Sequence, residues 1–298
     1  MKILITGANG FIGAHFIQYC LDYHLNFVAT GTKSECCIQN AGITYAMMDV
    51  TNPNQVWKVL QHYQPNVIVH AAAMSKPDEC QSNEDTCLQI NLMGTQHLLT
   101  AASKLNHDVH FIFISTDFVF GGNGPNAEDA LKQPLNFYGT SKLMAELCVM
   151  QLANPFAIVR PSFVFGPEIN GVRKDFLHGV LHKIQRGETV SIVNDQYRTP
   201  TFVPDFCKGL HQIITQQATG IFHLAGSAYI TPYQMVMLMV QLLQLPSKQI
   251  HPVTANDFPE PVKRAKKGGL VIEKAQNILG YTTTDIETAI RLSFAKTD

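Results

Sequence analysis

The stretch "KILITGANGFIG" (residues 2–13) decides the fold, because it joins an apolar strand-like run to a regularly spaced glycine turn. Gly7, Gly10 and Gly13 follow the spacing G-x-x-G-x-x-G. We assign Gly7 to a tight turn, Gly10 to close approach of a phosphate, and Gly13 to packing of the helix on the strand. A glycine-rich turn that serves packing alone is the alternative interpretation.

The helix that follows this turn offers a second feature of a nucleotide site. Its first turn contains Phe11 and Ile12. A helix N-terminus presents free N–H groups and the positive end of the helix dipole, both of which stabilise a pyrophosphate. The sequence therefore predicts a dinucleotide at the first strand-to-helix junction.

The first half of the chain alternates apolar runs with helical patterns. We expect strands over 2–6, 26–30, 44–50, 66–71, 109–115 and 156–160. We expect helices over 10–24, 54–63 and 83–106, and another that begins near residue 136. Strands that are apolar throughout and separated by helices are typical of a parallel sheet covered on both faces. The predicted class is α/β, with a Rossmann-type doubly wound parallel sheet.

After Arg160 the pattern loosens, and a smaller C-terminal lobe is expected. We predict a nucleotide-binding Rossmann domain over 1–160 and a mainly substrate-binding lobe over 161–298, with segments near 200–226 returning to the first domain. Helical patterns cover 176–187 and 231–245, and a strand pattern covers 220–226.

Composition excludes several classes of function. The 298 residues carry a formal net charge of −1 with 15% charged residues, so no nucleic-acid or membrane partner held by charge is expected. The seven cysteines form no C-x-x-C pair, and no histidine spacing implies a metal. Reduced thiols and a strand at the N-terminus instead of a signal peptide predict a cytoplasmic protein. The basic cluster "KRAKK" (263–267) is either a solvated turn or an anion-binding edge.

The segment "ATGTKSE" (29–35) bears on the choice of cofactor. An acidic residue directly after the second strand would bind a ribose 2′-hydroxyl, but Thr32, Lys33 and Ser34 stand there. A lysine and two hydroxyls can hold a 2′-phosphate, so the sequence favours NADP(H) over NAD(H). Glu35 leaves NAD(H) open as the alternative.

The next two strand ends supply further cofactor candidates. Asp49 and Val50 are placed to meet the adenine, although Asp49 could instead cap the helix that begins near Asn52. The small side chains after the following strand would let its end lie close to the cofactor; they are Ala71, Ala72 and Ala73.

The segment "NFYGTSKLMAE" (136–146) places Tyr138 and Lys142 four residues apart, on one face of the expected helix. Taken alone, the pair is an amphipathic tyrosine beside a solvated lysine.

In context, the glycine spacing and the Y-x-x-x-K motif resemble the extended short-chain dehydrogenase/reductase family. The other matching segments are "HAAA" (70–73), "INLMGT" (90–95), "ISTDFVFGG" (114–122), "YGTSKLMAE" (138–146) and "RPSFVFGP" (160–167). "STDFVFGG" and "RTPTFVPD" (198–205) look most like the dTDP-4-dehydrorhamnose reductase branch. The Arg-Pro, Asn and Leu pattern typical of that branch is not found in "PVKRAKKGGLVIEKAQNILGY" (261–281), which leaves the sugar open.

The resemblance implies an NAD(P)-dependent reductase of a nucleotide-linked 4-keto-deoxysugar, with dTDP-4-dehydro-L-rhamnose the expected substrate. Tyr138 would give a proton to the substrate oxygen that receives the negative charge. A free tyrosine has a pKa of about 10, and the ammonium of Lys142 would lower it. By resemblance, Lys142 also binds the nicotinamide ribose. Thr116 would orient the substrate oxygen, with adjacent Ser115 as the alternative.

Three further residues have supporting roles by resemblance. Asn91 would hold backbone geometry near the active site, or it is a plain helix-face asparagine. Ser75 and Arg198 would contact the substrate, Arg198 at a nucleotide diphosphate. A surface salt bridge is the alternative for Arg198. The family commonly forms homodimers, so a homodimer is expected.

Two other functions fit the same motifs. Epimerases and dehydratases of the family retain the cofactor and return the hydride, but dehydratases place an acidic pair directly after the catalytic threonine. Here only Asp117 follows Thr116. The regulatory beta subunit of methionine adenosyltransferase also resembles this branch, which makes a non-catalytic, cofactor-binding subunit the third hypothesis.

Overall fold

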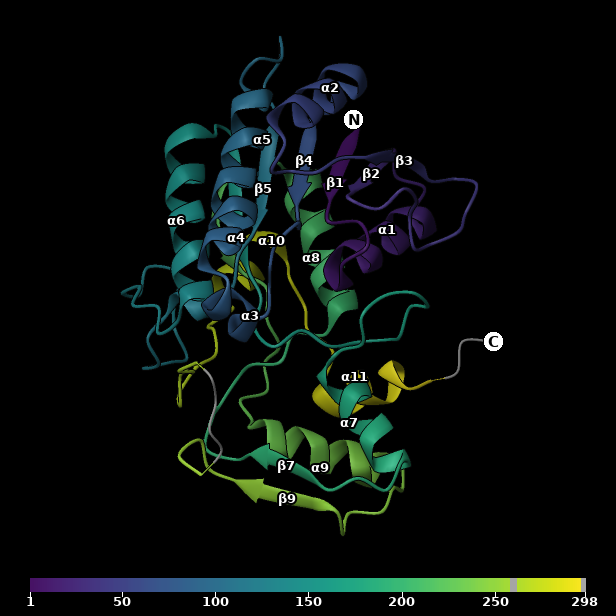
Figure 1. Cartoon of the computed structure of the whole chain (residues 1–298), viewed down its shortest axis with the longest axis vertical. Helices are drawn as coiled ribbons and strands as arrows, with labels where there is room; N and C mark the ends of the chain where they lie inside the picture. The colour runs from purple at the N-terminus through teal and green to yellow at the C-terminus, as the bar shows by residue number, and fades with distance from the viewer. Residues whose placement is uncertain (258–261, 296–298) are drawn as a thin grey trace.

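A seven-stranded parallel sheet forms the centre of the molecule, with helices on both faces and a smaller lobe beyond its carboxyl edge (Figure 1). The computed structural model describes residues 1–257 and 262–295. The sheet order is β3-β2-β1-β4-β5-β6-β8. The strands are β1 Ile3–Thr6, β2 Phe27–Gly31, β3 Thr44–Met47, β4 Val67–His70, β5 His110–Ile114, β6 Phe156–Arg160 and β8 Gly220–His223. The predicted α/β class is confirmed, although most strands are shorter than expected.

The strand order reverses at β1, which pairs in parallel with both β2 and β4. Ligands of such sheets bind beyond the carboxyl ends of the strands at this point. Side chains alternate across the sheet, so Ile3 and Ile5 enter one core and Leu4 enters the other. The buried strand therefore fixes where the glycine turn emerges.

Six helices cover the sheet. One face carries α1 (Phe11–Asp22), α8 (Val203–Gln216) and α10 (Glu273–Leu279), and the other carries α2 (Pro53–Tyr63), α5 (Gly94–Ala102) and α6 (Phe137–Leu152) (Figure 1). Segments from the C-terminal half lie in or on the sheet, namely α8, β8 and α10.

The helix predicted over 83–106 is broken. It consists of α4 (Glu84–Leu88), a π-helical turn η1 (Gln89–Met93) and α5. A Cβ at Gly94 would lie 2.7 Å from Cγ2 of Val50, so the glycine lets the helix pack closely there. Sequence periodicity cannot detect a single wide turn, since the apolar pattern continues on both sides of it. The sequence also missed the short helix α3 (Pro77–Ser82).

The C-terminal lobe has its own core. Helices α7 (Phe176–Gln185), α9 (Pro232–Leu242) and α11 (Ile286–Ser293) pack with a two-stranded parallel sheet of β7 (Val190–Val193) and β9 (Ile250–Val253). The sequence did not predict β7 or β9. The division at residue 160 stays a prediction. Among the described residues, no helix is both long and apolar enough to cross a membrane.

Candidate active site

The glycine turn is sterically determined. Gly7 has φ +70°, and a Cβ there would lie 2.7 Å from the backbone nitrogen of Ala72. A Cβ on Gly13 would lie 2.2 Å from the carbonyl oxygen of Gly7. Larger residues would therefore separate α1 from the turn, and the carboxyl ends of β1 and β4 could not approach each other. This close approach is the cradle that a dinucleotide requires at a helix N-terminus.

A groove with a cavity volume of about 740 Å³ runs along this edge of the sheet. Of the predicted cofactor residues, it is lined by Gly7, Gly10, Thr32, Lys33, Asp49, Val50, Ala71, Ala72 and Ala73. Phe11, Ile12, Gly13, Ser34 and Asn91 are not among its lining residues. Sequence reasoning missed Asn9, Gly31, Met48, Thr51, Asp85, Thr86, Gln89 and Ile90, which also line it. The last four come from the broken helix, whose wide turn left no signal in the sequence.

Asp49 does not cap α2, so that alternative was wrong. Asn52 is the cap, and its Oδ1 accepts hydrogen bonds from the backbone N–H groups of Asn54 and Gln55. The carboxylate of Asp49 accepts from the backbone and hydroxyl of Thr51, at 2.9 and 2.8 Å. Asp49 is therefore fixed at the groove by its own turn.

The loop after β2 is tied to the glycine turn. Asn9 donates to the carbonyl oxygen of Glu35 at 3.1 Å and accepts from the backbone N–H of Cys37 at 2.7 Å. The hydroxyl of Tyr45 donates to the carbonyl oxygen of Lys33 at 2.9 Å. These bonds fix the main chain of Glu35, while Lys33 is exposed at the groove.

Thr116 and Ser115 serve different sides of β5, as the alternation of a strand predicts. The hydroxyl of Ser115 donates to Glu146 at 2.5 Å, next to the fully buried ion pair of Glu146 with Arg160. Thr116 caps the short turn η2 (Asp117–Val119), and its hydroxyl opposes the rise in the pKa of the neighbouring Tyr138. The structure thus selects Thr116 over Ser115 as the neighbour of the tyrosine.

Tyr138 lies in the first turn of α6, which Asn136 caps. Lys142, one turn later, is buried with its Nζ 3.9 Å from the ring centroid of Phe113. Burial lowers the pKa of Lys142 to about 7, against the opposing effect of Glu146. The solvated-lysine interpretation of this pair is therefore wrong.

The pKa of Tyr138 moves opposite to the sequence-based expectation. Burial raises it, and the hydrogen bond from Thr116 only partly opposes the rise. The charge on Lys142 interacts instead with Glu146 and the thiols of Cys87 and Cys80. Removal of the Tyr138 phenol from water has a larger effect on its pKa than the charge of Lys142, which lies over the ring of Phe113. Tyr138 therefore stays a neutral phenol at neutral pH.

Asn91 is not a plain helix-face residue. It is buried in the π-helical turn, and its side chain bonds both the N–H and the C=O of Met74, at 2.8 and 3.0 Å. Its Nδ2 also donates to the hydroxyl of Ser141 at 2.9 Å. The wide turn in η1 thus aims Asn91 at the loop after β4 and links that loop to α6.

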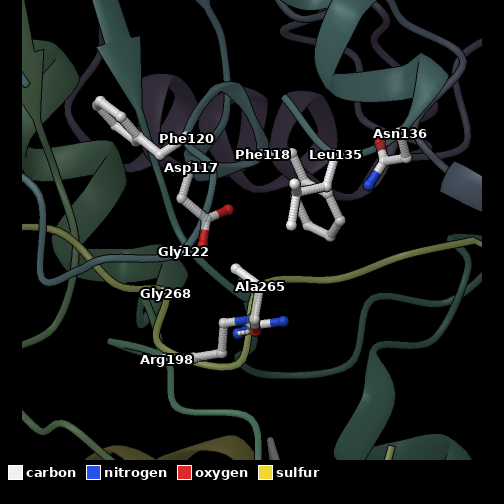
Figure 2. A pocket seen from close by; sticks show the side chains of 9 residues that line it. All are labelled: Asp117, Phe118, Phe120, Gly122, Leu135, Asn136, Arg198, Ala265 and Gly268. Carbon is white, nitrogen blue, oxygen red and sulfur yellow. Dashed lines mark hydrogen bonds between the residues drawn. The ribbon is translucent and has the colours of Figure 1, made fainter. Parts of the chain in front are cut away.

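A second, much smaller cavity lies beside Thr116. Figure 2 shows Asp117, Phe118 and Asn136 above Ala265, with Arg198 on the other side. The cavity measures about 10 Å³, the room of a single water molecule. Ser162 donates to Asp117 at 2.6 Å. Burial raises the pKa of Asp117, and the Arg198 guanidinium opposes that rise.

Arg198 is buried, so it does not form the surface salt bridge considered as its alternative. Its guanidinium donates to the carbonyl oxygens of Tyr197 and Ala265, at 2.8 and 2.6 Å, and to Gln196. Ser75, predicted to bind substrate, is exposed and is not among the residues that line either cavity.

The lysines of the basic cluster are exposed, as a solvated turn requires, and the anion-binding edge stays a prediction. Residues 263–269, which we call the strap, cross the small cavity between the two lobes. The backbone carbonyl of Lys263 accepts from Asn136 at 2.9 Å, and that of Lys267 accepts from the backbone of Gly124 at 2.8 Å. Arg264 forms an ion pair with Asp78 of α3 at 3.0 Å.

Known proteins with similar sequences and folds support this architecture. The model of the RmlD substrate binding domain family matches residues 1–298. Methionine adenosyltransferase 2 subunit beta of Danio rerio is 28% identical over 298 residues, covering 97% of this chain and 89% of that protein. The dTDP-4-dehydrorhamnose reductase of Aggregatibacter actinomycetemcomitans is 26% identical over 303 residues, covering 97% of each.

A solved structure shows the same arrangement over the whole chain. The dTDP-4-dehydrorhamnose reductase of Clostridium acetobutylicum superposes with a TM-score of 0.85 and 26% identity, covering 98% of both chains. The predicted resemblance to this reductase branch is confirmed, and the chain belongs to the RmlD substrate binding domain family.

Proposed function

We propose that the protein is an NAD(P)-dependent reductase that acts on the 4-keto group of a nucleotide-linked deoxysugar, as in dTDP-4-dehydrorhamnose reduction. The observation that carries the proposal is the placement of Thr116 beside the buried Tyr138, with Lys142 buried one turn later on α6. The residues next to Thr116 line the small cavity, and Ala71, Ala72 and Ala73 line the groove of dinucleotide size.

The nicotinamide cofactor, when bound, supplies the hydride. In this proposal Thr116 and Tyr138 bind the ketone oxygen, and Tyr138 donates its phenolic proton to that oxygen as charge develops. A raised pKa suits this direction, because it keeps the proton on Tyr138 until the stronger base appears. In this proposal the ammonium of Lys142, which does not lower the pKa of Tyr138 while the phenol is neutral, stabilises the phenolate once negative charge develops there.

A pH profile follows from this assignment. The pKa of Lys142 is lowered to about 7, so its charge is present below that pH and is lost above it. We expect kcat for reduction to fall as pH rises through about 7, because a neutral lysine no longer stabilises the phenolate. A kcat that instead increases from pH 7 to 9 would contradict the role of Lys142.

The direct test uses dTDP-4-dehydro-L-rhamnose and NADPH with purified protein. Tyr138→Phe is expected to reduce kcat about 10²–10⁴-fold, the usual contribution of a positioned proton donor. Its affinity for NADPH, measured by fluorescence titration, should match that of wild type. Tyr19→Phe is a matched control, because Tyr19 packs on Tyr23 and His211 away from the site. Full turnover by Tyr138→Phe would rule out the mechanism.

For the cofactor, we propose NADP(H) over NAD(H). Lys33 lines the groove, whereas the main chain of Glu35 is tied to Asn9. A residue with a side chain at Gly31 would place its Cβ 3.0 Å from the Tyr45 hydroxyl, so an acidic group at this strand end is disfavoured.

A second candidate is a non-catalytic, cofactor-binding subunit. It is favoured by the likeness to methionine adenosyltransferase 2 subunit beta and by a cavity that holds about one water molecule. Stoichiometric NADPH binding without turnover of any sugar nucleotide, together with co-elution with a methionine adenosyltransferase catalytic subunit, would favour it. A dehydratase is weaker, because Phe118 stands where a dehydratase carries its second acid.

We further propose a cytoplasmic homodimer. Exposed apolar residues on α6 support self-association; they are Met144, Leu147 and Met150. All seven cysteines are free thiols, as a reducing compartment requires. Sedimentation of wild type and Leu147→Glu tests the dimer, because a charge in a helix–helix interface would yield a monomer.

A further inference from the structure

Two cysteines lie directly against the proposed catalytic residues, and the mechanism above does not use them. Cys80 on α3 and Cys87 on α4 are fully buried and share a small cluster with Tyr138. Both are free thiols. Met74, Phe118 and Phe137 complete this cluster, so a displacement of either sulfur atom would change the packing around the Tyr138 ring.

The two sulfur atoms occupy a polar pocket. Both sulfur atoms belong to one hydrogen-bond network around Asn91 and the carbonyl oxygen of Met74. Cys87 also donates to the hydroxyl of Ser141 at 3.3 Å and accepts from Nδ2 of Asn91 at 3.3 Å. Cys80 donates to the carbonyl oxygen of Met74 at 3.3 Å, the same oxygen that Asn91 binds. The sulfur atoms are thus neighbours within one network that joins the loop after β4 to α6.

This pair differs from Cys20 and Cys207, which are also buried. Cys20 and Cys207 lie in the apolar core between α1 and α8, where burial raises the pKa of Cys20 to about 12 and that of Cys207 well above its usual value. The surroundings of Cys87 are polar, and the pKa of its thiol is lowered, first by Cys80 and then, against burial, by Ser141 and Lys142, whereas the pKa of Cys80 is raised. The thiolate is the reactive form of cysteine, so Cys87 is the attacking member of the pair, and Cys20 and Cys207 are inert.

We propose that Cys80 and Cys87 are a redox-sensitive dithiol that closes to a disulfide under oxidation by a low-molecular-weight disulfide. The Cys87 thiolate attacks one sulfur of the oxidant and forms a mixed disulfide with it, while the other sulfur leaves as a thiolate and takes up a proton. The Cys80 thiolate then displaces the second half of the oxidant from the mixed disulfide. The protein loses two hydrogens, and the oxidant is reduced to two thiols.

Access to the pair comes through α3. This helix has six residues, too short to be stable alone, so local opening there costs less than global unfolding. Closure to an S–S bond of about 2.05 Å removes the Cys87 donor to Ser141 and pulls α3 toward α4. The hydrogen bonds of Asn91 to Met74 and the packing around Tyr138 would then change.

The regulatory consequence rests on the proposed reductase function, but the dithiol chemistry does not. The experiment exposes the full-length protein to oxidised glutathione and maps cross-linked peptides by mass spectrometry, with NADPH-dependent turnover measured in parallel. We expect a Cys80–Cys87 cross-link and a fall in kcat of at least about ten-fold, since displacement of a catalytic group by an ångström has at least this effect. Dithiothreitol should restore activity.

Cys80→Ser tests the assignment, because it retains a hydrogen-bonding group but cannot cross-link. Its activity should resist oxidised glutathione, whereas Cys207→Ala should be inactivated like wild type. Oxidation of Cys37 shows that the oxidant is active. If Cys37 is oxidised but no Cys80–Cys87 cross-link forms, the dithiol proposal is wrong. If the cross-link forms without loss of turnover, the regulatory proposal is wrong. If the protein reduces no sugar nucleotide, the reductase proposal is wrong. The dithiol proposal is still tested in that case, by the cross-link map and by the NADPH affinity of the oxidised protein.

Discussion

The groove and the small cavity are built in opposite ways. The groove is assembled from the carboxyl ends of neighbouring strands, and it has a volume of about 740 Å³. The cavity is assembled from segments around Asp117, Asn136, Arg198 and Ala265, and it measures about 10 Å³. A site made by adjacent strands is set by local geometry, whereas a site made by distant segments depends on how two lobes and a strap meet.

The largest expected effect is on the groove. Gly7→Ala should abolish NADPH binding and destabilise the fold by several kcal/mol, because a Cβ at φ +70° also meets the backbone of Ala72. Gly187→Ala is the matched control, since Gly187 has φ +72° with nothing within 4 Å of its Cβ. It should lose only about 1 kcal/mol and bind NADPH normally. Chemical denaturation and fluorescence titration measure both, and equal losses would contradict the steric argument.

Acid should act on the sheet before the C-terminal lobe. Burial lowers the pKa of His70 and His223 to about 3 and that of His15 to about 4. These folded-state values lie below the unfolded value of about 6.5, so stability is complete above that pH and falls as pH decreases toward 4. Each histidine should contribute a slope of up to about 1.4 kcal/mol per pH unit.

His70 provides the test of this acid sensitivity, since its ring bonds Thr6 and Thr95 at 2.7 and 3.0 Å. His70→Gln should reduce the slope of unfolding free energy against pH between 6 and 4. His251, exposed on β9, offers the control His251→Gln. An unchanged slope in His70→Gln would show that His70 is not protonated on unfolding.

A smaller effect is expected on cofactor choice. Lys33→Ala should weaken NADPH binding by about ten-fold, or about 1.4 kcal/mol, and leave NADH binding unchanged, because only NADPH carries a 2′-phosphate. Lys58→Ala, on the exposed side of α2, is the matched control. Equal weakening of NADPH and NADH binding would show that Lys33 does not contact the 2′-phosphate.

The smallest effect should be on the strap. Arg264→Gln removes the ion pair with Asp78, which is partly exposed and is therefore worth about 0.2–1 kcal/mol. We expect a change of a few-fold in KM for the sugar nucleotide, with NADPH affinity unchanged, since the strap covers only the small cavity. Lys266→Gln, which breaks the largely exposed pair of this strap residue with Asp195, is the control. A loss of NADPH affinity in Arg264→Gln would show that the two sites are not separate.

The sequence by itself determined the sheet and the positions of its ligand edge. Apolar runs gave β1, β2, β4, β5 and β6 within a few residues, and the glycine spacing placed the turn whose geometry Gly7 and Gly13 obey. These features depend on neighbours in the chain, so local pattern was sufficient. The motif also predicted Thr116, Tyr138 and Lys142 as catalytic residues, and this assignment stays a prediction; the structure places Thr116 beside Tyr138 and buries Lys142 one turn later on α6.

Only the tertiary structure decided the rest. The direction of the Tyr138 pKa depends on burial by residues far along the chain, and a motif carries no information about desolvation. Likewise, nothing local to "KRAKK" shows that Arg264 meets Asp78 across 186 residues. Cys80 and Cys87 became neighbours of Lys142 only when two short helices packed against α6. Local sequence pattern specifies the secondary structure. The packing of segments that are distant in the sequence determines the local dielectric around each side chain and the contacts it makes.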